Sequence, residues 1–362
     1  MLAASQDHGR AMPLPQLLEL SDQSYSDVTI TGMELDSRKV GAGDLFLAMP
    51  GDVHDGRQFI EQAVANGASA VLAEAPAAGF VDAIPVPLLE WPDLRLEAGP
   101  LAARFYGEPS ASMHVIGITG TNGKTTTSRL LSQLARGLGR QCGVIGTLGA
   151  TLGDEVSKAG NTTPDPLALQ RQLALWRDQG VGTVSMEVSS HALVQGGVSG
   201  VRFETAVYTN ISHDHLDYHG SMGDYVRAKM RLFASEGLRN ALINVDDELA
   251  ALVAAAVAEG VQILTYSASG AGADVRVVNA EFHSGGVRGE LQTPWGQGVF
   301  DSPLPGAFNL ANLAAAVASL ALAGEDFDAI LPRVRQLRSV PGRMQRIPND
   351  LGIQVIVDYA HT

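Results

Sequence analysis

The chain has 362 residues, of which 45% are hydrophobic and 18% are charged, and its formal net charge is −14. This composition argues against a mainly disordered chain, and the acidic balance argues against broad electrostatic binding to nucleic acid or anionic membranes. A single cysteine, Cys142, excludes a disulfide framework and a multi-cysteine metal site and suits a reducing compartment. At about 150 residues per domain, the length predicts two or three domains.

Neither the N-terminus nor the most apolar stretch carries a targeting or membrane signal. Residues 1–10 lack the apolar core of a signal peptide, and the stretch 310–324 is shorter than the ~20 residues that cross a bilayer. The alanine-rich sequence after Asn309 instead favours a packed helix. We therefore expect a cytoplasmic protein without an inserted segment.

The first 110 residues follow a compact α/β pattern. The predicted elements are strands over 44–49 and 69–74 and helices over 57–66 and 94–106. Turn formers at 107–110 mark a boundary, so residues 1–110 are predicted to form a small α/β domain.

Residues 111–346 are predicted to form a second α/β domain around a mostly parallel, doubly wound sheet. Apolar strands alternate with helical segments, while 274–300 has the alternating pattern and the turns of an antiparallel excursion. The predicted strands are 114–119, 143–147, 183–188, 205–210, 241–245 and 261–266, and the predicted helices are 124–138 and two within 309–338.

A further strand is predicted at the end of the chain. Residues 353–358 read IQVIVD, an apolar run typical of a strand that is buried on both faces. Because such a strand needs neighbours, residues 347–362 are interpreted as the first strand of a truncated C-terminal domain.

The sequence GITGTNGKTT, residues 117–126, predicts a phosphate-binding loop. It follows a predicted strand and opens a predicted helix, whose N-terminal N–H groups would contact the anion. Lys124 would contact the β- and γ-phosphates, and the Thr125 hydroxyl would bind Mg²⁺. The general spacing is not met, because Ile118 occupies the first glycine position and Gly120 must make the close approach instead. The alternative is an ordinary glycine-rich turn with a solvent-facing lysine.

Possible metal ligands follow two other predicted strands. Glu187 ends one strand and could hold Mg²⁺ directly or through water, or it could simply face solvent. After the strand 205–210, three histidines and two aspartates fall within Asn210–Gly220. This cluster fits a zinc site, a second Mg²⁺ or phosphate-orienting site, or a polar loop with capping aspartates. Nearby Lys229, considered alone, is expected to be a solvated surface lysine.

Together these segments resemble the Mur ligase family, and within it the branch that adds the third amino acid of the peptide. The matching segments are LDSRKVGAGDLFLAMPG, GITGTNGKTTT, NTTPDP, MEVSSHALVQ, DHLDYHGSMGDYVRAKMRLF, LPGAFNLANLAAA, VPGRMQ and VDYAHT. They occur in this order over nearly the whole chain, and the unusual loop spacing is itself the pattern of the family.

The resemblance implies an ATP-dependent amide ligase of peptidoglycan precursor synthesis, with ATP and Mg²⁺ as cofactors. It would add a diamino acid, expected to be meso-diaminopimelate rather than lysine, to UDP-MurNAc-L-Ala-D-Glu through an acyl-phosphate. The expected partners are these small molecules, with no nucleic acid and no membrane insertion. The resemblance leaves open whether a second Mur ligase is fused downstream as a further partner.

The resemblance also assigns site residues by motif, with Lys124, Lys229 and His215 as the expected catalytic residues. ATP-binding positions are matched by Gly120, Thr121, Asn122, Gly123, Lys124, Thr125, Thr126, Asn309, Asn312, Arg343 and Asp358. Metal-binding positions are matched by Thr125, Glu187, His215 and, once carbamylated, Lys229. Positions for the UDP-MurNAc-dipeptide are matched by Leu35, Ser37, Asp52, Val53, His54, Asn161, Thr162, Thr163, Ser189 and Gln195. Carbamylation of Lys229 would replace a cation that repels Mg²⁺ by a carboxylate that can orient it.

One position departs from the family pattern. An arginine usually follows two residues after the glutamine of SSHALVQ, but Gly196 and Gly197 follow Gln195 here. An anchor for the peptide is then missing or supplied from elsewhere.

Three rival functions stay open from the sequence. The first is a related ligase with the same ATP core, such as the enzyme adding D-Ala-D-Ala or a folylpolyglutamate synthetase, although the LDSR and DGRQF segments argue against it. The second is a non-catalytic nucleotide-binding module. The third is a metal phosphoesterase built on the histidine cluster.

The expected truncation predicts little or no ligase activity for this chain alone. In the family the C-terminal domain carries the pocket for the added amino acid, so the second half-reaction would lack its amine substrate site. Phosphate release from ATP with UDP-MurNAc-L-Ala-D-Glu and diaminopimelate measures this. Release at the rate of a full-length ligase would contradict the prediction.

Overall fold

The computed structural model describes two compact units. The described residues are 10–21, 24–51, 53–80, 83–157, 161–214, 216–347, 353 and 355–359. Unit 1 comprises Met1–Ser112, Pro164–Asp178 and Val194–Val201, and unit 2 comprises Met113–Thr163, Gln179–Leu193 and Arg202–Thr362. Unit 1 therefore takes two segments from the middle of the chain. The predicted division at 1–110, 111–346 and 347–362 follows sequence order and stays a prediction.

Unit 1 contains a four-stranded parallel sheet with both faces covered. Its elements are β1 (Met12–Pro13), α1 (Leu14–Leu18), β2 (Thr29–Ile30), β3 (Gly32–Glu34), β4 (Asp44–Ala48), the 3₁₀ turn η1 (Gly56–Phe59), α2 (Ile60–Ala65), β5 (Ala70–Glu74), β6 (Leu88–Trp91), α3 (Leu94–Phe105), η2 (Pro109–Ser112) and α5 (Pro166–Asp178). The sheet order is β3-β4-β5-β6, and β1 pairs with β2 separately. Leu45 and Leu47 of β4 join the core formed with α1 and α3, while Phe46 and Ala48 join the core formed with α2. This alternation follows from the two-residue period of a strand.

Unit 2 is built on a large sheet that is parallel at its centre. Its strands are β7 (His114–Thr119), β8 (Cys142–Gly146), β9 (Gly149–Leu152), β10 (Glu155–Ser157), β11 (Thr183–Glu187), β12 (Thr205–Tyr208), β13 (Asn240–Asn244), β14 (Gln262–Ser267), β15 (Val275–His283), β16 (Gly286–Thr293) and β17 (Gly296–Ser302). They lie in the order β10-β9-β8-β11-β7-β12-β13-β14-β15-β16-β17. The strands from β8 to β15 are parallel, and β9, β10, β16 and β17 are antiparallel additions at the two ends. The predicted fold class, including the antiparallel excursion, is confirmed.

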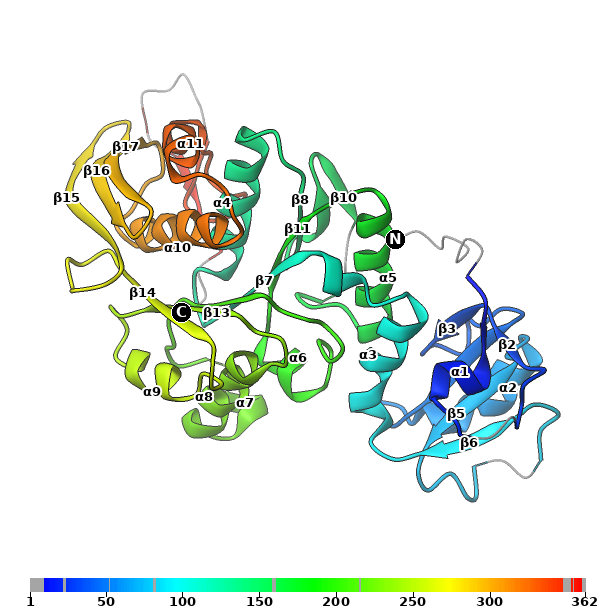
Figure 1. Ribbon diagram of the computed structural model, residues 1–362. Helices are drawn as coiled ribbons and strands as arrows, with labels where there is room; N and C mark the ends of the chain where they lie inside the picture. Colours follow the sequence, from blue (N-terminus) through cyan, green and yellow to red (C-terminus); the bar gives the residue numbers. More distant parts are fainter. Residues whose placement is uncertain are drawn as a thin grey trace. The chain divides into compact units, whose positions relative to one another are not determined.

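Helices lie on both sides of the unit 2 sheet, as a doubly wound fold requires. They are α4 (Lys124–Gly137), α6 (Ser190–Val194, whose last residue belongs to unit 1), α7 (Leu216–His219), α8 (Met222–Met230), α9 (Ala250–Ala255), α10 (Phe308–Leu322) and α11 (Phe327–Ile330), with the 3₁₀ turns η3 (Arg231–Ala234) and η4 (Leu331–Gln336). Figure 1 shows α4 and α10 on one side and α8 and α9 on the other.

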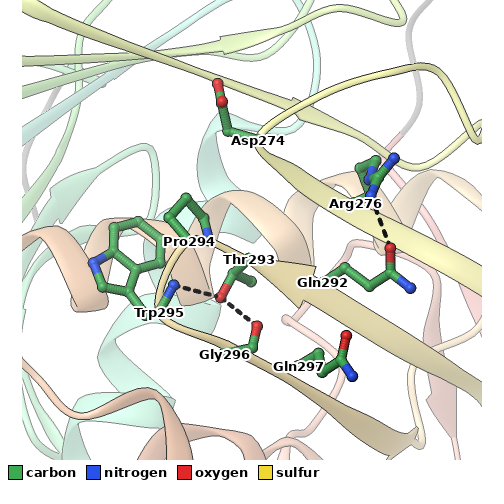
Figure 2. Close-up of a pocket in the computed structure, with 8 residues that line it drawn as sticks. All are labelled: Asp274, Arg276, Gln292, Thr293, Pro294, Trp295, Gly296 and Gln297. Carbon is green, nitrogen blue, oxygen red and sulfur yellow. Dashed lines mark hydrogen bonds between the residues drawn. The ribbon is translucent and has the colours of Figure 1, made fainter.

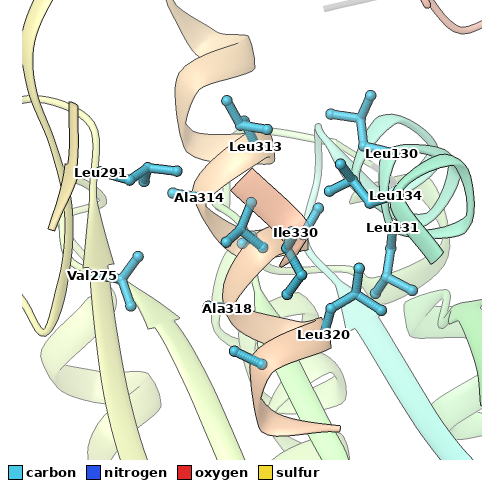
Figure 3. Close-up of a cluster of buried hydrophobic side chains, with 14 of the residues drawn as sticks. Leu130, Leu131, Leu134, Val275, Leu291, Leu313, Ala314, Ala318, Leu320 and Ile330 are labelled. Atoms are coloured by element: carbon cyan, nitrogen blue, oxygen red, sulfur yellow. The ribbon is translucent and has the colours of Figure 1, made fainter. Parts of the chain in front are cut away.

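The main core of unit 2 forms where α4 and α10 pack on the sheet. Figure 3 shows leucines of α4 meeting α10, with Val275 and Leu291 of the sheet and Ile330 of α11 beside them. Alanines such as Ala314 and Ala318 allow close packing of α10, which forms the predicted packed helix within 310–324. In the described part of the chain, no helix combines the length and apolarity that crossing a membrane requires.

The predicted strand near the C-terminus differs from expectation in its burial. The structure has a short strand, β19 (Val355–Val357), which pairs antiparallel with β18 (Gln345–Ile347). Ile356 is 40% exposed, so the prediction of a strand buried on both faces is wrong for the described residues. The apolar run correctly predicted a strand at this position. It did not predict the burial of the strand, because a short apolar run does not identify the elements that pack on it.

Truncation of Leu131 tests the α4–α10 core. L131A is expected to lower the free energy of unfolding by about 2–5 kcal/mol, because Leu131 is fully buried in that core. L252A is the matched control, since Leu252 is 52% exposed on α9 of the same unit, and it should cost less than about 0.5 kcal/mol. Urea unfolding followed by circular dichroism measures both, and equal losses would contradict the assignment of the core.

Candidate active site

The predicted phosphate loop joins β7 to α4, and two glycines give it its shape. Gly120 and Gly123 have φ values of +145° and +88°, which side chains rarely tolerate. A Cβ on Gly120 would lie 2.0 Å from Thr209 Oγ1, so the loop also needs the glycine for close contact with the segment after β12. That segment holds the loop, because Thr121 N donates to Asn210 O at 2.7 Å and Thr209 Oγ1 donates to Asn122 O at 2.6 Å.

Two lysines donate to the same carbonyl oxygen of this loop. Lys124 Nζ lies 2.7 Å from Gly120 O and 2.9 Å from Thr121 O. Lys229 Nζ lies 2.8 Å from Gly120 O. Burial lowers the pKa of Lys124, an effect that the charges of Glu187 and Asp214 oppose and that of Arg343 reinforces. The two amino groups predicted to be catalytic therefore meet at one point of the loop.

Lys229 is buried, so the expectation of a solvated surface lysine, based on that residue alone, is wrong. Its exposed fraction is 1%, and its Nζ lies 4.5 Å from the centroid of the Tyr225 ring. Burial holds the pKa of Lys229 well below its ordinary value, and the charge of Lys124 lowers it further against the opposing charge of Asp214. Helix periodicity could not reveal this, because Lys229 is covered by the distant phosphate loop as well as by Tyr225 of its own helix α8.

Glu187 lies at the end of β11 and is bound by two threonines. Thr125 Oγ1 donates to Glu187 Oε2 at 2.8 Å. Thr147 donates twice, from N to Oε1 at 3.0 Å and from Oγ1 to Oε2 at 3.1 Å. A Cβ on Gly146 would lie 2.0 Å from Glu187 Oε1, so that glycine leaves the space that the carboxylate occupies. Glu187 is 2% exposed, which contradicts the alternative of a solvent-facing strand end.

The threonines predicted to contact the muramoyl peptide lie beside this carboxylate. Thr163 Oγ1 donates to Glu187 O at 3.1 Å and accepts from Ser189 N at 3.3 Å. Thr162 Oγ1 lies 3.2 Å from Thr147 Oγ1, and Asn161 is exposed. The structure therefore brings this group and the phosphate loop together around Glu187.

The predicted adenine-side asparagines are buried and hydrogen-bonded within the fold. Asn309 Nδ2 donates to Pro305 O at 2.6 Å, and Asn312 Nδ2 donates to Asn309 Oδ1 at 3.1 Å. Thr127 Oγ1 of α4 donates to Asn312 Oδ1 at 3.2 Å. A Cβ on Gly123 would lie 2.6 Å from the same Oδ1, so Asn312 lies close against the phosphate loop.

Two further ATP-binding predictions fall near the C-terminus. The charge of Arg343 acts on Lys124, as its effect on the lysine pKa shows. Asp358 is exposed, and its neighbour Tyr359 donates from N to Gly342 O at 2.9 Å.

The two remaining ATP-binding predictions lie at the phosphate loop. Thr126 is buried on the first turn of α4, while Asn122 is exposed on the loop.

The histidine cluster does not form a metal site among the described residues. His215 lies outside them, so its predicted role stays a prediction. His213 is exposed, and His219 Nε2 lies 2.9 Å from Ser190 Oγ. Within the described ranges, no group of three or more His, Cys, Asp or Glu side chains could hold a metal ion. The zinc-based alternative therefore finds no support there.

The predicted uridine-end residues lie in unit 1. Ser37 is buried and donates from Oγ to Gln62 Oε1 at 2.8 Å, and neighbouring Leu35 is half-buried. Val53 is 84% exposed on a hairpin loop, in which Gly51 N donates to His54 O at 2.8 Å. Asp52 lies outside the described residues. Gln195, predicted for the peptide, also belongs to unit 1.

A pocket of about 630 Å³ opens on β15, β16 and β17, around the turn that carries Trp295 (Figure 2). Arg276 Nη2 donates to Gln292 Oε1 across it at 2.9 Å. No predicted site residue lines this pocket, so it does not bear on the chemistry of the loop.

Sequence reasoning did not identify several residues that build the site. Thr147 donates to Glu187, and Thr209 donates to the phosphate loop. Tyr225 lies beside Lys229, and its OH lies 3.0 Å from Thr121 Oγ1. Thr147 and Thr209 both follow parallel strands at their carboxyl ends, where ligand sites of α/β sheets form, so that rule could have found them. Tyr225 gave no such signal.

Comparisons with known proteins give one family for both parts of the chain. Residues 118–320 match the Mur ligase middle domain, and residues 29–106 match the catalytic domain of the Mur ligase family. The UDP-N-acetylmuramoyl-L-alanyl-D-glutamate--2,6-diaminopimelate ligase of Coxiella burnetii is 44% identical over 354 residues, which cover 96% of this chain and 72% of that protein. A solved structure of a ligase of the same name has a TM-score of 0.86 at 35% identity and covers 97% of this chain and 72% of its own.

A second ligase is less similar. The structure of MurF from Acinetobacter baumannii has a TM-score of 0.66 at 26% identity and covers 91% of this chain and 68% of its own. The family predicted from the motifs is confirmed by these matches and by the arrangement of the loop, Glu187 and Lys229. The chain therefore belongs to the Mur ligase family and is an ATP-dependent carbon–nitrogen ligase of peptidoglycan synthesis.

Proposed function

We propose that this chain binds ATP and UDP-MurNAc-L-Ala-D-Glu and activates the substrate carboxylate for addition of meso-diaminopimelate. The observation that carries the proposal is the meeting of Lys124, Lys229 and the Thr125–Glu187 pair at one glycine-rich loop. The substrate and the diamino acid follow from the names of the similar ligases. We place the activity in the cytoplasm, where ATP is available.

Lys124 is the residue that binds the transferred phosphate. Its Nζ donates to Gly120 O and Thr121 O, which are weaker partners than a phosphate oxygen. A bound γ-phosphate would replace these carbonyls as acceptor. The loop N–H groups at the start of α4 and Arg343 would share the remaining phosphate charge.

The donors around Glu187 fit a magnesium ion. Thr125 Oγ1 and the Glu187 carboxylate supply only oxygen atoms, which Mg²⁺ prefers, and they already lie 2.8 Å apart. Thr147 orients the carboxylate from its other side. The ion would neutralise charge on the transferred phosphoryl group. His215 is proposed for a second metal position on motif alone.

Lys229 is proposed to be carbamylated. Its low pKa favours the neutral amine, whose Nζ can attack CO₂, form an N–C bond and release one proton. The product is an anion where the structure now has a buried amine beside Lys124. That anion would attract Lys124 and a metal ion instead of repelling them.

The reaction then proceeds in two balanced steps. A carboxylate oxygen of the substrate attacks the γ-phosphorus, the bond to the β-phosphate oxygen breaks, and ADP leaves. The amine of the diamino acid attacks the acyl carbon, phosphate leaves, and the new amide nitrogen loses a proton. Thr163 and Ser189 lie next to Glu187 and are proposed to hold the peptide, while Leu35, Ser37 and the 52–54 loop hold the uridine end.

Binding to the purified chain tests this function. We expect UDP-MurNAc-L-Ala-D-Glu to bind more tightly than UDP-MurNAc-L-Ala or the UDP-MurNAc-tripeptide, and ATP to bind with Mg²⁺, by isothermal titration calorimetry. K124M should weaken ATP binding by about 10–100-fold, because a charge-assisted contact to phosphate is lost, and leave UDP-sugar binding unchanged. Tighter binding of the tripeptide would indicate a D-Ala-D-Ala-adding ligase instead. Absence of UDP-sugar binding would overturn the proposal.

Gly146 provides a test of the metal position. G146A is expected to weaken Mg²⁺-dependent ATP binding by about 10–100-fold, because the new Cβ would displace the Glu187 carboxylate. ATP binding in EDTA should not change, since Glu187 then has no metal to hold. G182A is the matched control, because a Cβ there would meet nothing within 4 Å. Equal weakening with and without Mg²⁺ would show that Glu187 is not a metal ligand.

A further inference from the structure

Within unit 1, the segment Val194–Val201 packs its backbone directly on α3. A Cβ on Gly99 of α3 would lie 2.0 Å from Ser199 O, and one on Gly200 would lie 2.6 Å from Gly99 O. Further along, a Cβ on Gly196 would lie 2.8 Å from Arg95 O. Gly196, which follows Gln195, therefore lies against the backbone of Arg95 in the first turn of α3.

The side chain of Arg95 reaches the hairpin loop proposed to hold uridine. Its Nη2 donates to Pro50 O, and Pro50 pairs with Asp55 across the base of that loop. The other end of the loop is held by Arg57, whose Nε donates to Asp55 Oδ1 at 3.0 Å and whose Nη2 donates to Asp55 Oδ2 at 2.7 Å. Two arginines thus fasten the two ends of one loop.

The two arginines differ in their charge balance. Arg57 is paired with the Asp55 carboxylate, its Nη1 donates to Pro76 O at 2.9 Å, and its guanidinium lies 4.2 Å from the centre of the Phe80 ring. Among the residues that the structure describes, no carboxylate forms an ion pair with Arg95. Arg95 is half-buried and fixed to a neutral carbonyl, so its positive charge can still serve an anionic ligand.

We infer that Arg95 binds the diphosphate of the UDP-sugar substrate. This inference rests on the proposed function, because it takes the loop around Val53 and His54 as the uridine site. The group that follows the nucleoside along such a ligand is the diphosphate, and a guanidinium binds phosphate oxygens in a bidentate manner. The Arg95 guanidinium is placed for this role because its Nη2 donates to Pro50 O at the base of the same loop.

Calorimetry with UDP and uridine as probes, on the unmodified chain and on each single variant in turn, tests the inference. R95Q is expected to weaken UDP binding by about 10–100-fold, while uridine binding stays the same, because only UDP carries the anion. R95K should recover part of the UDP affinity through its charge, and added salt should weaken UDP binding less in R95Q than in the unmodified chain. R104Q is the matched control, since Arg104 lies on the same helix and donates to Leu17 O at 2.6 Å.

The outcomes separate the possible failures. Unchanged UDP binding in R95Q would overturn the inference, as would equal weakening of UDP and uridine, which would mean that Arg95 only fastens the loop. Comparable weakening in R104Q would also overturn it, because the effect would then come from helix stability. If the unmodified chain bound UDP but not UDP-MurNAc-L-Ala-D-Glu, the proposed function would fail while the role of Arg95 in diphosphate binding stood.

Discussion

The site of unit 2 depends on one carbonyl oxygen, that of Gly120. Two lysine amino groups converge on it, and the segment after β12 supplies the residues that hold its loop in place. Burial away from water is the main cause of the lowered pKa values of Lys124 and Lys229, and the charge of Lys124 lowers the pKa of Lys229 further. The loop is thus arranged for negative charge that has to come from a ligand or from modification of a lysine. A chain with a net charge of −14 can bind polyanions because this concentration of positive charge is local.

Glycines make the close contacts of both units possible. Gly120 and Gly146 leave room for Thr209 and Glu187 in unit 2, and Gly99 and Gly200 let two backbones touch in unit 1. Each of these contacts would be blocked by a single methyl group. Some of the 40 glycines of the chain therefore lie at positions where backbone or side-chain groups approach closely.

Much of the fold could be predicted from the sequence, because strands such as 114–119 and helices such as 94–106 carry strong local patterns. The phosphate loop could be placed for the same reason, since its strand, glycines and lysine are consecutive. Long-range contacts could not be predicted. The burial of Lys229 under the loop, the bond between Asn312 and Thr127, and the exposure of Ile356 all depend on residues distant in sequence. The motifs predicted site residues, but they gave no sign that Asn309 and Asn312 are hydrogen-bonded to the protein itself.

The segmented make-up of unit 1 has a consequence for synthesis of the chain. The core that unit 1 forms with α1 and α3 includes Leu167 and Ala174 of α5, and Ser199 and Gly200 contact α3. A ribosome that has made only the first 112 residues has therefore not yet supplied all the apolar partners of α3. Unit 1 can be completed only after residue 201 has emerged, when several strands of unit 2 have already been translated. Unit 1 therefore cannot complete its fold before translation of unit 2 has begun, although each unit has a sheet of its own.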